Sequence, residues 1–338
     1  MTPSRTLQPT EPPAALPPEP MDPQVRSVQP GGGLVYQLEL AWGGVRRFWL
    51  RTFRPGYVRR MEALRKGEFN GCPHPVLDPR DVKFFRNQGG YHWDPADDPF
   101  RWRDRIPFAR WGLAELFAFS ALTFGPAVVL AVVLSLVTVS AWLAVVGWVA
   151  VAGLAVVGGL IVWFFRDPHR VVPTEPGLVV APADGLVVTI EEVDDPFVGP
   201  AVMIGIFLSI FNVHVNRSPV AGRVIGIEYR RGKFLNALLP ASARENERMT
   251  VRFQEDGPAH RRYVVRQIAG AIARRIVCAV RPGDRQARGE RFGMIKFGSR
   301  TELVLPRTAG LSVRVKVGDK VQAGATVFAA YADLPPAG

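Results

Sequence analysis

The fold of this 338-residue chain is decided by its longest uncharged stretch, residues 116–165, which reads LFAFSALTFGPAVVLAVVLSLVTVSAWLAVVGWVAVAGLAVVGGLIVWFF. No Asp, Glu, Lys or Arg interrupts these 50 residues. A helix that crosses the hydrocarbon core of a bilayer needs about 20 residues. The stretch is too long for one span, so it predicts a transmembrane hairpin with helices over residues 118–138 and 142–164. The alternative is a hairpin buried in a large soluble core, but soluble helices normally carry a polar face.

Charges on both flanks of this stretch indicate which side of the membrane holds the rest of the chain. Basic residues lie before and after it, namely Arg101, Arg103, Arg105, Arg110, Arg166 and Arg170. Cationic segments that flank transmembrane helices stay in the cytoplasm. We therefore expect the hairpin to sit in the cell (inner) membrane, with the C-terminal domain on the cytoplasmic face.

Two further zones precede the hairpin. Residues 1–33 are rich in proline with Gln, Glu and Thr, and this composition buries too little apolar surface to fold, so it predicts a disordered tail. Residues 34–110 form an N-terminal extension of unknown role. Within it, Tyr36–Trp42 alternates weakly like a strand, and Tyr91–Pro99 has the composition of a loop.

The C-terminal zone, residues 166–338, predicts a β-rich (α+β) domain with barrel or hybrid-type sheets. Short apolar runs alternate there with Gly, Pro and Asp, which is typical of β structure. The turn VGDKVQAG is similar to the turn of lipoyl and biotinyl carrier domains, which favours a barrel architecture. Strands are expected over residues 179–190 (two strands and a turn), 202–211, 224–229, 263–268, 272–279 and a closing hairpin at 311–328.

The charge of the chain indicates an acidic partner. The net charge is +12, and residues 166–338 contribute 25 Lys and Arg against 17 Asp and Glu. Nucleic acid and anionic lipid both meet this requirement, but the hairpin brings lipid headgroups within reach. We expect anionic membrane lipid and no nucleic acid as a partner. Cys72 and Cys278 have no metal-binding or redox spacing, so no metal site is expected.

The dipeptide Gly298-Ser299 can carry covalent chemistry. The hydroxyl of a serine that follows glycine can attack the preceding carbonyl, and the ester so formed eliminates to dehydroalanine. Hydrolysis then leaves a pyruvoyl group on residue 299 and divides the chain into residues 1–298 and 299–338. Taken alone, the dipeptide is equally typical of a tight turn.

Six short motifs accompany this dipeptide in a fixed order. They are Phe164–Arg170 (FFRDPHR), Ala181–Gly185 (APADG), Asn212–Pro219 (NVHVNRSP), Gly232–Ala237 (GKFLNA), Glu245–Arg248 (ENER) and Phe297–Arg300 (FGSR). Together with the apolar stretch ahead of them, the motifs resemble the short, membrane-linked type of phosphatidylserine decarboxylase. The resemblance covers residues 105–335 and leaves most of the N-terminal extension unexplained.

The resemblance implies an enzyme that converts phosphatidylserine to phosphatidylethanolamine and CO2, through a Schiff base with a self-generated pyruvoyl group at Ser299. Decarboxylation of an amino acid needs a carbonyl cofactor, because no side chain is an electron sink. Pyridoxal phosphate would require an α/β fold that a β-rich domain does not provide. Residues 166–338 would form the decarboxylase domain, its two cleavage fragments would remain associated, and an oligomer is left open.

The resemblance also implies roles for individual residues. Ser299 would be both nucleophile and cofactor precursor, His214 would carry the proton, and Asp184 would orient the histidine in a serine-protease-like trio. A tight turn is the alternative for Asp184. Longer family members have a second histidine where this chain has Arg217, so whether His214 serves both cleavage and decarboxylation stays open. The tentative substrate-binding residues are Arg300, Lys233, Phe234, Asn236, Glu245 and Asn246, for which exposed or solvated positions are the alternative.

Two other functions remain open at this point. The first keeps the pyruvoyl chemistry but acts on another amino-acid-headed lipid or on a soluble amino acid. The second is a non-enzymatic, membrane-tethered barrel adaptor in which Gly298-Ser299 is only a turn.

Overall fold

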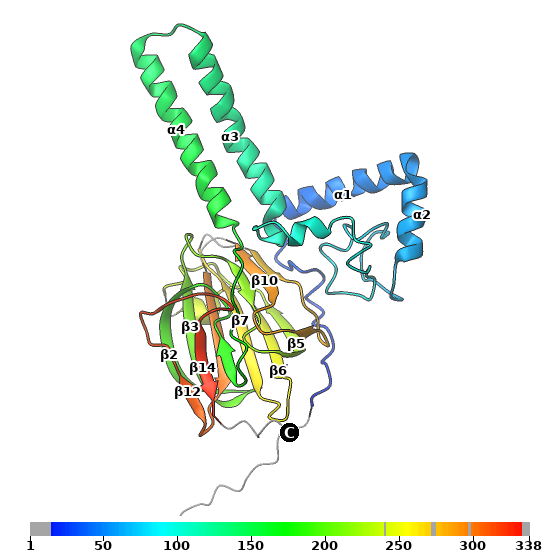
Figure 1. The fold of residues 1–338 in the computed structure, drawn as a ribbon, viewed down its shortest axis with the longest axis vertical. Helices are drawn as coiled ribbons and strands as arrows, with labels where there is room; N and C mark the ends of the chain where they lie inside the picture. Colours follow the sequence, from blue (N-terminus) through cyan, green and yellow to red (C-terminus); the bar gives the residue numbers. More distant parts are fainter. Residues whose placement is uncertain (1–14, 240, 272–274, 297–298, 333–338) are drawn as a thin grey trace, which may run out of the picture.

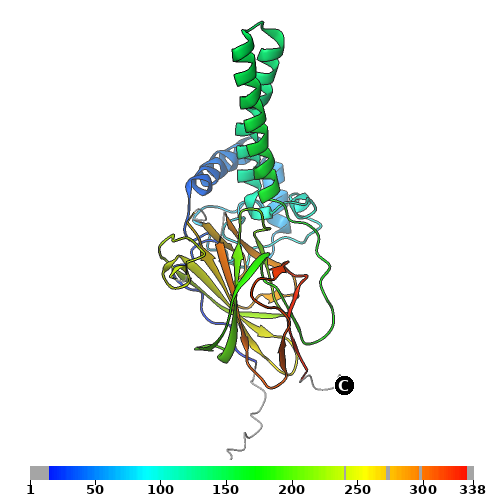
Figure 2. The same cartoon turned by 90° about the vertical axis from the view of Figure 1, so that its left-hand side faces the viewer.

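Three parts make up the chain: a β domain, a helical hairpin that projects from it, and an N-terminal extension beside the base of the hairpin (Figure 1). The computed structural model describes residues 15–239, 241–271, 275–296 and 299–332. The hairpin stands clear of the rest of the molecule, while the extension and the β domain both meet its base (Figures 1 and 2).

The hairpin consists of α3 (Leu113–Leu136) and α4 (Ala141–Phe164), which pack side by side along their length. The two candidate spans have mean hydropathies of 2.2 and 2.5, and only 11% and 6% of their apolar windows are buried inside the protein. The core helix of a soluble protein would be mostly covered. The low burial therefore favours membrane association over the alternative of a hairpin in a soluble core.

The β domain is built on an eight-stranded antiparallel sheet in the order β13-β2-β3-β11-β7-β6-β5-β9, which curls into a half-barrel. Two three-stranded sheets, β1-β14-β12 and β4-β10-β8, accompany it. The β-rich fold class predicted from the sequence is confirmed. The strands are β1 (Leu178–Val180), β2 (Gly185–Asp195), β3 (Gly199–Leu208), β4 (Val215–Arg217), β5 (Gly222–Arg230), β6 (Arg248–Glu255), β7 (Arg262–Ala269), β8 (Arg275–Cys278), β9 (Arg285–Gln286), β10 (Arg291–Lys296), β11 (Ser299–Pro306), β12 (Leu311–Val313), β13 (Lys320–Val321) and β14 (Val327–Tyr331).

The last segment of the chain differs from the expected closing hairpin. Strand β12 pairs with β14, which also pairs with β1, whereas the intervening β13 joins the large sheet beside β2. Residues 311–331 therefore contribute to two sheets. The C-terminal segment is distributed through the domain and does not form a separate hairpin at its edge.

The N-terminal extension is helical where a strand was predicted. Residues 36–42 lie inside α1 (Leu34–Phe53), which is followed by α2 (Pro55–Leu64). The strand prediction was wrong because the apolar residues repeat at helical spacing over the whole of residues 34–53, and seven residues are too few to show that period. Two short 3₁₀ helices, η1 (Arg101–Asp104) and η2 (Arg110–Gly112), lead into α3.

Residues 15–33 also differ from the expectation of a disordered tail, because they run along the β domain in a defined path. Val25 and Val28 are each 1% exposed. The Val28 N–H donates to the Phe84 carbonyl, and the Cys278 N–H donates to the Val28 carbonyl, both at 2.8 Å. Two apolar anchors and these backbone bonds supply the order that composition alone did not predict. Residues 1–14 lie outside the described part of the chain.

The end of the hairpin is clamped to the β domain. Phe165 follows α4 and is fully buried, and its carbonyl accepts a hydrogen bond from the Ala109 N–H at 2.7 Å. The buried Asp167 carboxylate then pairs with Arg217 Nη2 at 2.8 Å and with Arg291 Nε at 2.6 Å. These contacts fix how the hairpin leaves the domain.

We expect Asp167→Asn to destabilise the domain by about 3–5 kcal/mol, because it leaves Arg217 buried without its anion. The matched control is Glu192→Gln, which removes one partner of an exposed surface pair with Arg307 and costs at most about 1 kcal/mol. Denaturant unfolding of both variants in detergent micelles measures the difference. Equal effects of the two substitutions would show that the clamp does not stabilise the fold.

Candidate active site

Ser299 is the first residue of β11, a strand in the interior of the large sheet. It pairs with Leu208 at the end of β3 on one side and with Ala269 at the end of β7 on the other. Its side chain is fully buried, and within the described part of the structure its Oγ has no hydrogen-bond partner. A buried polar group without a partner costs about 1–3 kcal/mol. Such an atom in a native fold calls for a functional explanation.

His214 reaches the same end of the sheet through a tight turn after β3. The turn is held by Asn212 Oδ1, which accepts hydrogen bonds from the Ser209 N–H at 2.9 Å and the Ser209 hydroxyl at 2.7 Å. The His214 carbonyl accepts from the Ile295 N–H at 3.2 Å, four residues before Ser299. The structure therefore brings His214 and Ser299 into one region, where β3, β10 and β11 meet.

The environment of the His214 ring keeps it neutral. The ring lies 4.4 Å, centroid to centroid, from that of Phe164, the last residue of α4. Burial lowers the pKa of His214 to about 4, against a weaker opposing effect of its hydrogen bond to the Asn212 carbonyl. Nδ1 lies 2.9 Å from that carbonyl oxygen, so Nδ1 carries the proton and Nε2 is the basic ring nitrogen. A neutral imidazole in this form can accept a proton.

Asp184 does not join His214 in the expected trio. Its Oδ2 accepts from Arg170 Nη2 at 2.7 Å, and its Oδ1 accepts from the Ala323 N–H at 2.8 Å. Burial raises the pKa of this carboxyl, while the Ala323 N–H and Arg170 lower it. The carbonyl of Asn212, not a carboxylate, holds Nδ1 of His214.

A buried polar cluster connects the Asp184 loop with the strand of Ser299. The Asn216 side-chain amide donates to Thr301 Oγ1 at 3.3 Å and to the Pro182 carbonyl at 3.4 Å. Gln267 Nε2 in turn donates to Asn216 Oδ1 at 2.9 Å. Because alternate residues of a strand share a face, Thr301 lies on the same face of the sheet as Ser299. This cluster therefore fixes the core beneath the serine.

Arg300 lies on the opposite face of the sheet. Successive side chains of a strand point to opposite faces, and the Arg300 guanidinium donates to Glu302 Oε1 at 2.9 Å and to Thr189 Oγ1 at 3.2 Å. Its charge is thus engaged away from the Ser299 side chain. The structure does not bring Arg300 and Ser299 together as a substrate-steering pair.

The other predicted substrate residues divide into an exposed group and a structural one. Lys233 and Glu245 form an exposed ion pair at 2.7 Å, Asn236 is exposed beside them, and Phe234 is half-buried against the core. The fully buried Asn246 differs, because its side-chain amide donates to the carbonyls of Leu235 at 2.8 Å and Ala269 at 2.7 Å. It therefore ties this loop to the residue that pairs with Ser299.

Sequence reasoning missed a buried ion pair next to the serine. Lys296, three residues before Ser299, is 4% exposed and binds both Glu115 in the first turn of α3 and Gln29, the latter at 3.2 Å. The signal available in the sequence was Glu115, a single acidic residue directly before the uncharged stretch 116–165. The pair joins the hairpin to the strand that leads to the Gly298-Ser299 peptide. Gly298 itself lies outside the described residues.

The surface beside this region is apolar where it meets the hairpin. Phe211 is 57% exposed and Ile210 is 43% exposed, in the turn that positions His214. The Phe211 carbonyl accepts hydrogen bonds from Trp163 Nε1 at 3.2 Å and from Arg166 Nη2 at 2.8 Å. The turn that positions His214 therefore lies at the end of the domain from which the hairpin emerges.

Comparison with known proteins gives a consistent result. The family model described as phosphatidylserine decarboxylase matches residues 157–329. A protein of Rhodopirellula baltica is 50% identical over 250 residues, which cover 74% of this chain and 99% of the relative. Proteins of Nitrosomonas eutropha and Burkholderia mallei are 49% and 47% identical, over 51% and 52% of this chain and 78% and 80% of their own lengths. All three relatives are named phosphatidylserine decarboxylase proenzyme. This chain belongs to the phosphatidylserine decarboxylase family.

Proposed function

We propose that this chain is a phosphatidylserine decarboxylase, a carboxy-lyase that converts phosphatidylserine to phosphatidylethanolamine and CO2. The observation that carries the proposal is the buried hydroxyl of Ser299 at the hairpin end of the central sheet, which has no hydrogen-bond partner among the described residues, in a chain of this family. A turn serine in an adaptor protein would have its hydroxyl in water or in a hydrogen bond.

The residues around Ser299 fit a pyruvoyl group made from that serine. Strands β3 and β7 hold position 299 from both sides, and no residue that the structure describes forms a hydrogen bond with Oγ that its conversion would break. When present, the group would supply the electron sink that decarboxylation of an amino acid requires. Position 299, held by these two strands, is where the group would be kept away from bulk water.

The proposed self-cleavage uses the chain's own atoms. Ser299 Oγ attacks the Gly298 carbonyl carbon, a C–O bond forms, the Gly298–Ser299 C–N bond breaks, and the serine nitrogen takes up a proton. Elimination then removes the Cα proton of residue 299 and breaks the bond between its Cβ and Oγ, so that a Cα=Cβ double bond forms and a Gly298 carboxylate and dehydroalanine are left. Water adds to the dehydroalanine, ammonia leaves, and a keto group remains at residue 299.

His214 is the proposed proton carrier for this sequence. Its neutral ring can take the Ser299 hydroxyl proton and return it to the departing nitrogen. Asn212 is the positioning residue that fixes the tautomer. A catalytic part for Asp184 stays a prediction, and its contacts with Arg170 and Ala323 support a role in holding the 181–184 loop.

The two cleavage fragments are proposed to remain associated. The shorter one, residues 299–338, begins with β11, which pairs with β3 and β7 of the longer fragment. It also contributes β13 beside β2 and β14 beside β1. Four strand pairings between the fragments replace the single bond that is lost.

The proposed location is the cell (inner) membrane, with the β domain on the cytoplasmic face. The basic flanks of the hairpin support this orientation. Phe164 at the end of α4 stacks on His214, so the reacting region lies where the hairpin leaves the bilayer. The exposed Lys233 and Asn236 and the half-buried Phe234 are proposed to contact the headgroup of phosphatidylserine, whereas the placement of Arg300 supports a structural role.

The activity is tested with phosphatidylserine carrying labelled carbon in the serine carboxylate, in lipid nanodiscs with the full chain. We expect labelled CO2 from this lipid and none from free labelled serine, because His214 lies against Phe164 at the base of the hairpin, next to the proposed membrane surface. Release of CO2 from free serine at a comparable rate would favour a soluble amino acid as substrate and contradict the proposal.

Ser299→Ala should leave one uncut chain with activity at background, because the nucleophile and the source of the keto group are both lost. The control Ser312→Ala changes an exposed serine on β12 and should be cut like the natural sequence. Mass spectrometry distinguishes the intact chain from the two fragments. Cutting at the same peptide bond in Ser299→Ala would overturn the assignment of the nucleophile.

The pH dependence of self-cleavage reports on His214. The ring is neutral above its pKa, so the cleavage rate of freshly synthesised precursor should stay flat from pH 7 toward 5 and fall with a midpoint near 4. An ordinary histidine would give a midpoint near 6.5. Tryptophan fluorescence at each pH checks that the precursor is folded. A midpoint near 6.5 in folded protein would exclude His214 in its observed environment as the base.

A further inference from the structure

Helix α1 of the N-terminal extension turns its apolar side away from the protein. Seven large apolar residues recur along it at helical spacing, and each is between 47% and 76% exposed. Such a stripe normally faces a protein core. The seven residues, hereafter the α1 stripe, are Leu34, Leu38, Trp42, Val45, Phe48, Trp49 and Phe53.

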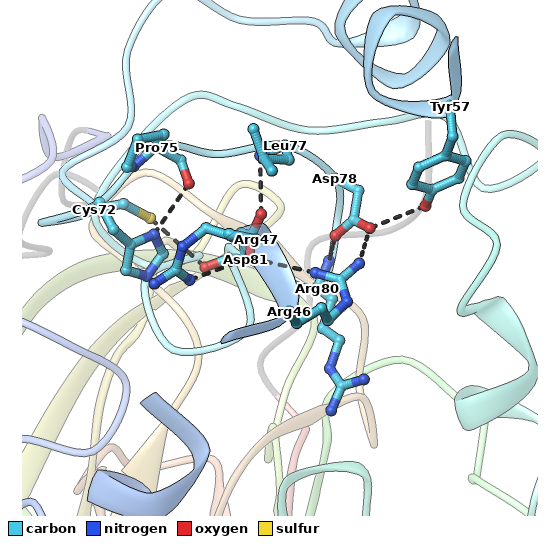
Figure 3. Close-up of polar contacts among 10 residues, drawn as sticks. Arg46, Arg47, Tyr57, Cys72, Pro75, Leu77, Asp78, Arg80 and Asp81 are labelled. Carbon is cyan, nitrogen blue, oxygen red and sulfur yellow. Dashed lines mark hydrogen bonds and ion pairs between the residues drawn. The ribbon is translucent and has the colours of Figure 1, made fainter. Parts of the chain in front are cut away.

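The side of the same helix that packs against the protein carries two arginines beside the buried Leu50. Arg46 pairs with Asp78 and with Asp81, the latter at 3.4 Å, and Arg47 pairs with Asp81 at 3.3 Å (Figure 3). The Tyr57 hydroxyl of α2 donates to Asp78 Oδ2 at 2.9 Å. The side chains of Asp78 and Asp81 are 0% and 2% exposed. The arrangement is inverted relative to a helix of a soluble protein, and the buried ion pairs hold it in place.

The direction of the stripe follows from the position of those aspartates. Residues 66–104 lie on the β-domain side of α1, while the hairpin projects to the opposite side (Figures 1 and 2). Arg47 points to Asp81, and at helical spacing the α1 stripe is centred on the side of the helix opposite Arg47, so the stripe points to the side toward which the hairpin projects. The α1 stripe thus faces the side on which the surface of the bilayer would lie if α3 and α4 span it.

Charged and aromatic residues next to the stripe match a lipid surface. Arg51, Arg54, Arg59 and Arg60, at the end of α1 and in α2, are exposed. Basic side chains beside an apolar helix face are attracted to anionic headgroups. Trp42 and Trp49 within the stripe are of the type enriched at membrane interfaces. A second copy of this chain would bring the same arginines together and repel.

We propose that α1 is an interfacial helix that lies in the surface of an anionic bilayer, with the α1 stripe at the boundary between headgroups and acyl chains. The extension would then supply a second membrane contact beside the hairpin. A hairpin alone could tilt in the bilayer together with the β domain that is clamped to it. The added contact would hold the turn of Ile210 and Phe211 at a fixed height above the lipid.

The test measures the depth of single probes on the full chain. A Ser299→Ala, Cys72→Ala background is used, so the result does not depend on self-cleavage or decarboxylation. Cys278 is fully buried, and burial raises the pKa of its thiol to about 12, so it does not label. An environment-sensitive fluorophore is placed at Val45→Cys in the stripe or at the exposed control position Glu62→Cys in α2. The protein is reconstituted in phosphatidylglycerol-containing vesicles with a nitroxide quencher just below the headgroups.

We expect the nitroxide to quench the Val45 probe several-fold more strongly than the Glu62 probe. Adding Trp42→Glu and Phe48→Glu should remove most of this difference, whereas Phe69→Glu, an equally exposed apolar residue outside α1, should leave it unchanged. Equal weak quenching at both positions would place the stripe in water. Blue-shifted Val45 emission that resists the lipid quencher and rises with protein concentration would assign the stripe to a second copy. Either result would overturn the proposal.

Discussion

The C-terminal end of the hairpin is buried against the protein and not exposed to water, and this constraint organises the molecule. Its last residue, Phe164, stacks on His214, and the next, Phe165, is fully buried at the junction with the residues that precede α3. Two residues later the Asp167 carboxylate is held by arginines from β4 and from the start of β10. A membrane anchor joined by a free linker would leave the reacting end of the domain at any height. In this protein the last turn of the hairpin packs directly against His214 through Phe164.

A second constraint acts on Ser299. Its strand is paired on both sides, so the backbone on either side of the serine is fixed by the sheet. Burial of the side chain removes water, and no described residue competes for its hydroxyl. The hydroxyl therefore carries an uncompensated desolvation cost that a protein would not retain for stability alone. A function for Ser299 explains why this cost is retained. The ion pair of Lys296 and Glu115 connects the same region to the base of the hairpin.

The sequence predicted what local composition controls. The uncharged stretch fixed the hairpin to within a few residues, because a bilayer demands length and apolarity and little else. Alternating apolar runs gave the β domain, and the order of six motifs gave the family. The helix at residues 34–53 was missed because its period appears only when the whole stretch is taken together. The ordered path of residues 15–33 depends on the packing of Val25 and Val28 against residues far away in the sequence, and composition does not predict such contacts.

The sequence indicated candidate residues for the site, but it did not indicate the contacts between them. The motifs predicted Ser299 and His214 as partners, and the structure places His214 six residues after Leu208, the residue that pairs with Ser299; their joint role stays a prediction. Asp184 fails to meet His214 because its carboxylate is taken by Arg170 and by a backbone amide 139 residues away. Long-range partners of this kind follow from sheet topology, which no single segment of sequence encodes. The same applies to Arg300, whose face of the sheet is set by strand alternation.

If the chain is cut before Ser299, as proposed, the distribution of strands β11 to β14 among those of the longer fragment affects how the protein loses its native state. A continuous chain can unfold and refold as one molecule. After such a cut, heat or denaturant can release the shorter fragment. It must then find the longer fragment by diffusion and insert β11 between β3 and β7. By then these two strands will have paired with each other or aggregated. Loss of the native state is then governed by the rate of opening and not by an equilibrium, so the lifetime of the enzyme is a kinetic property.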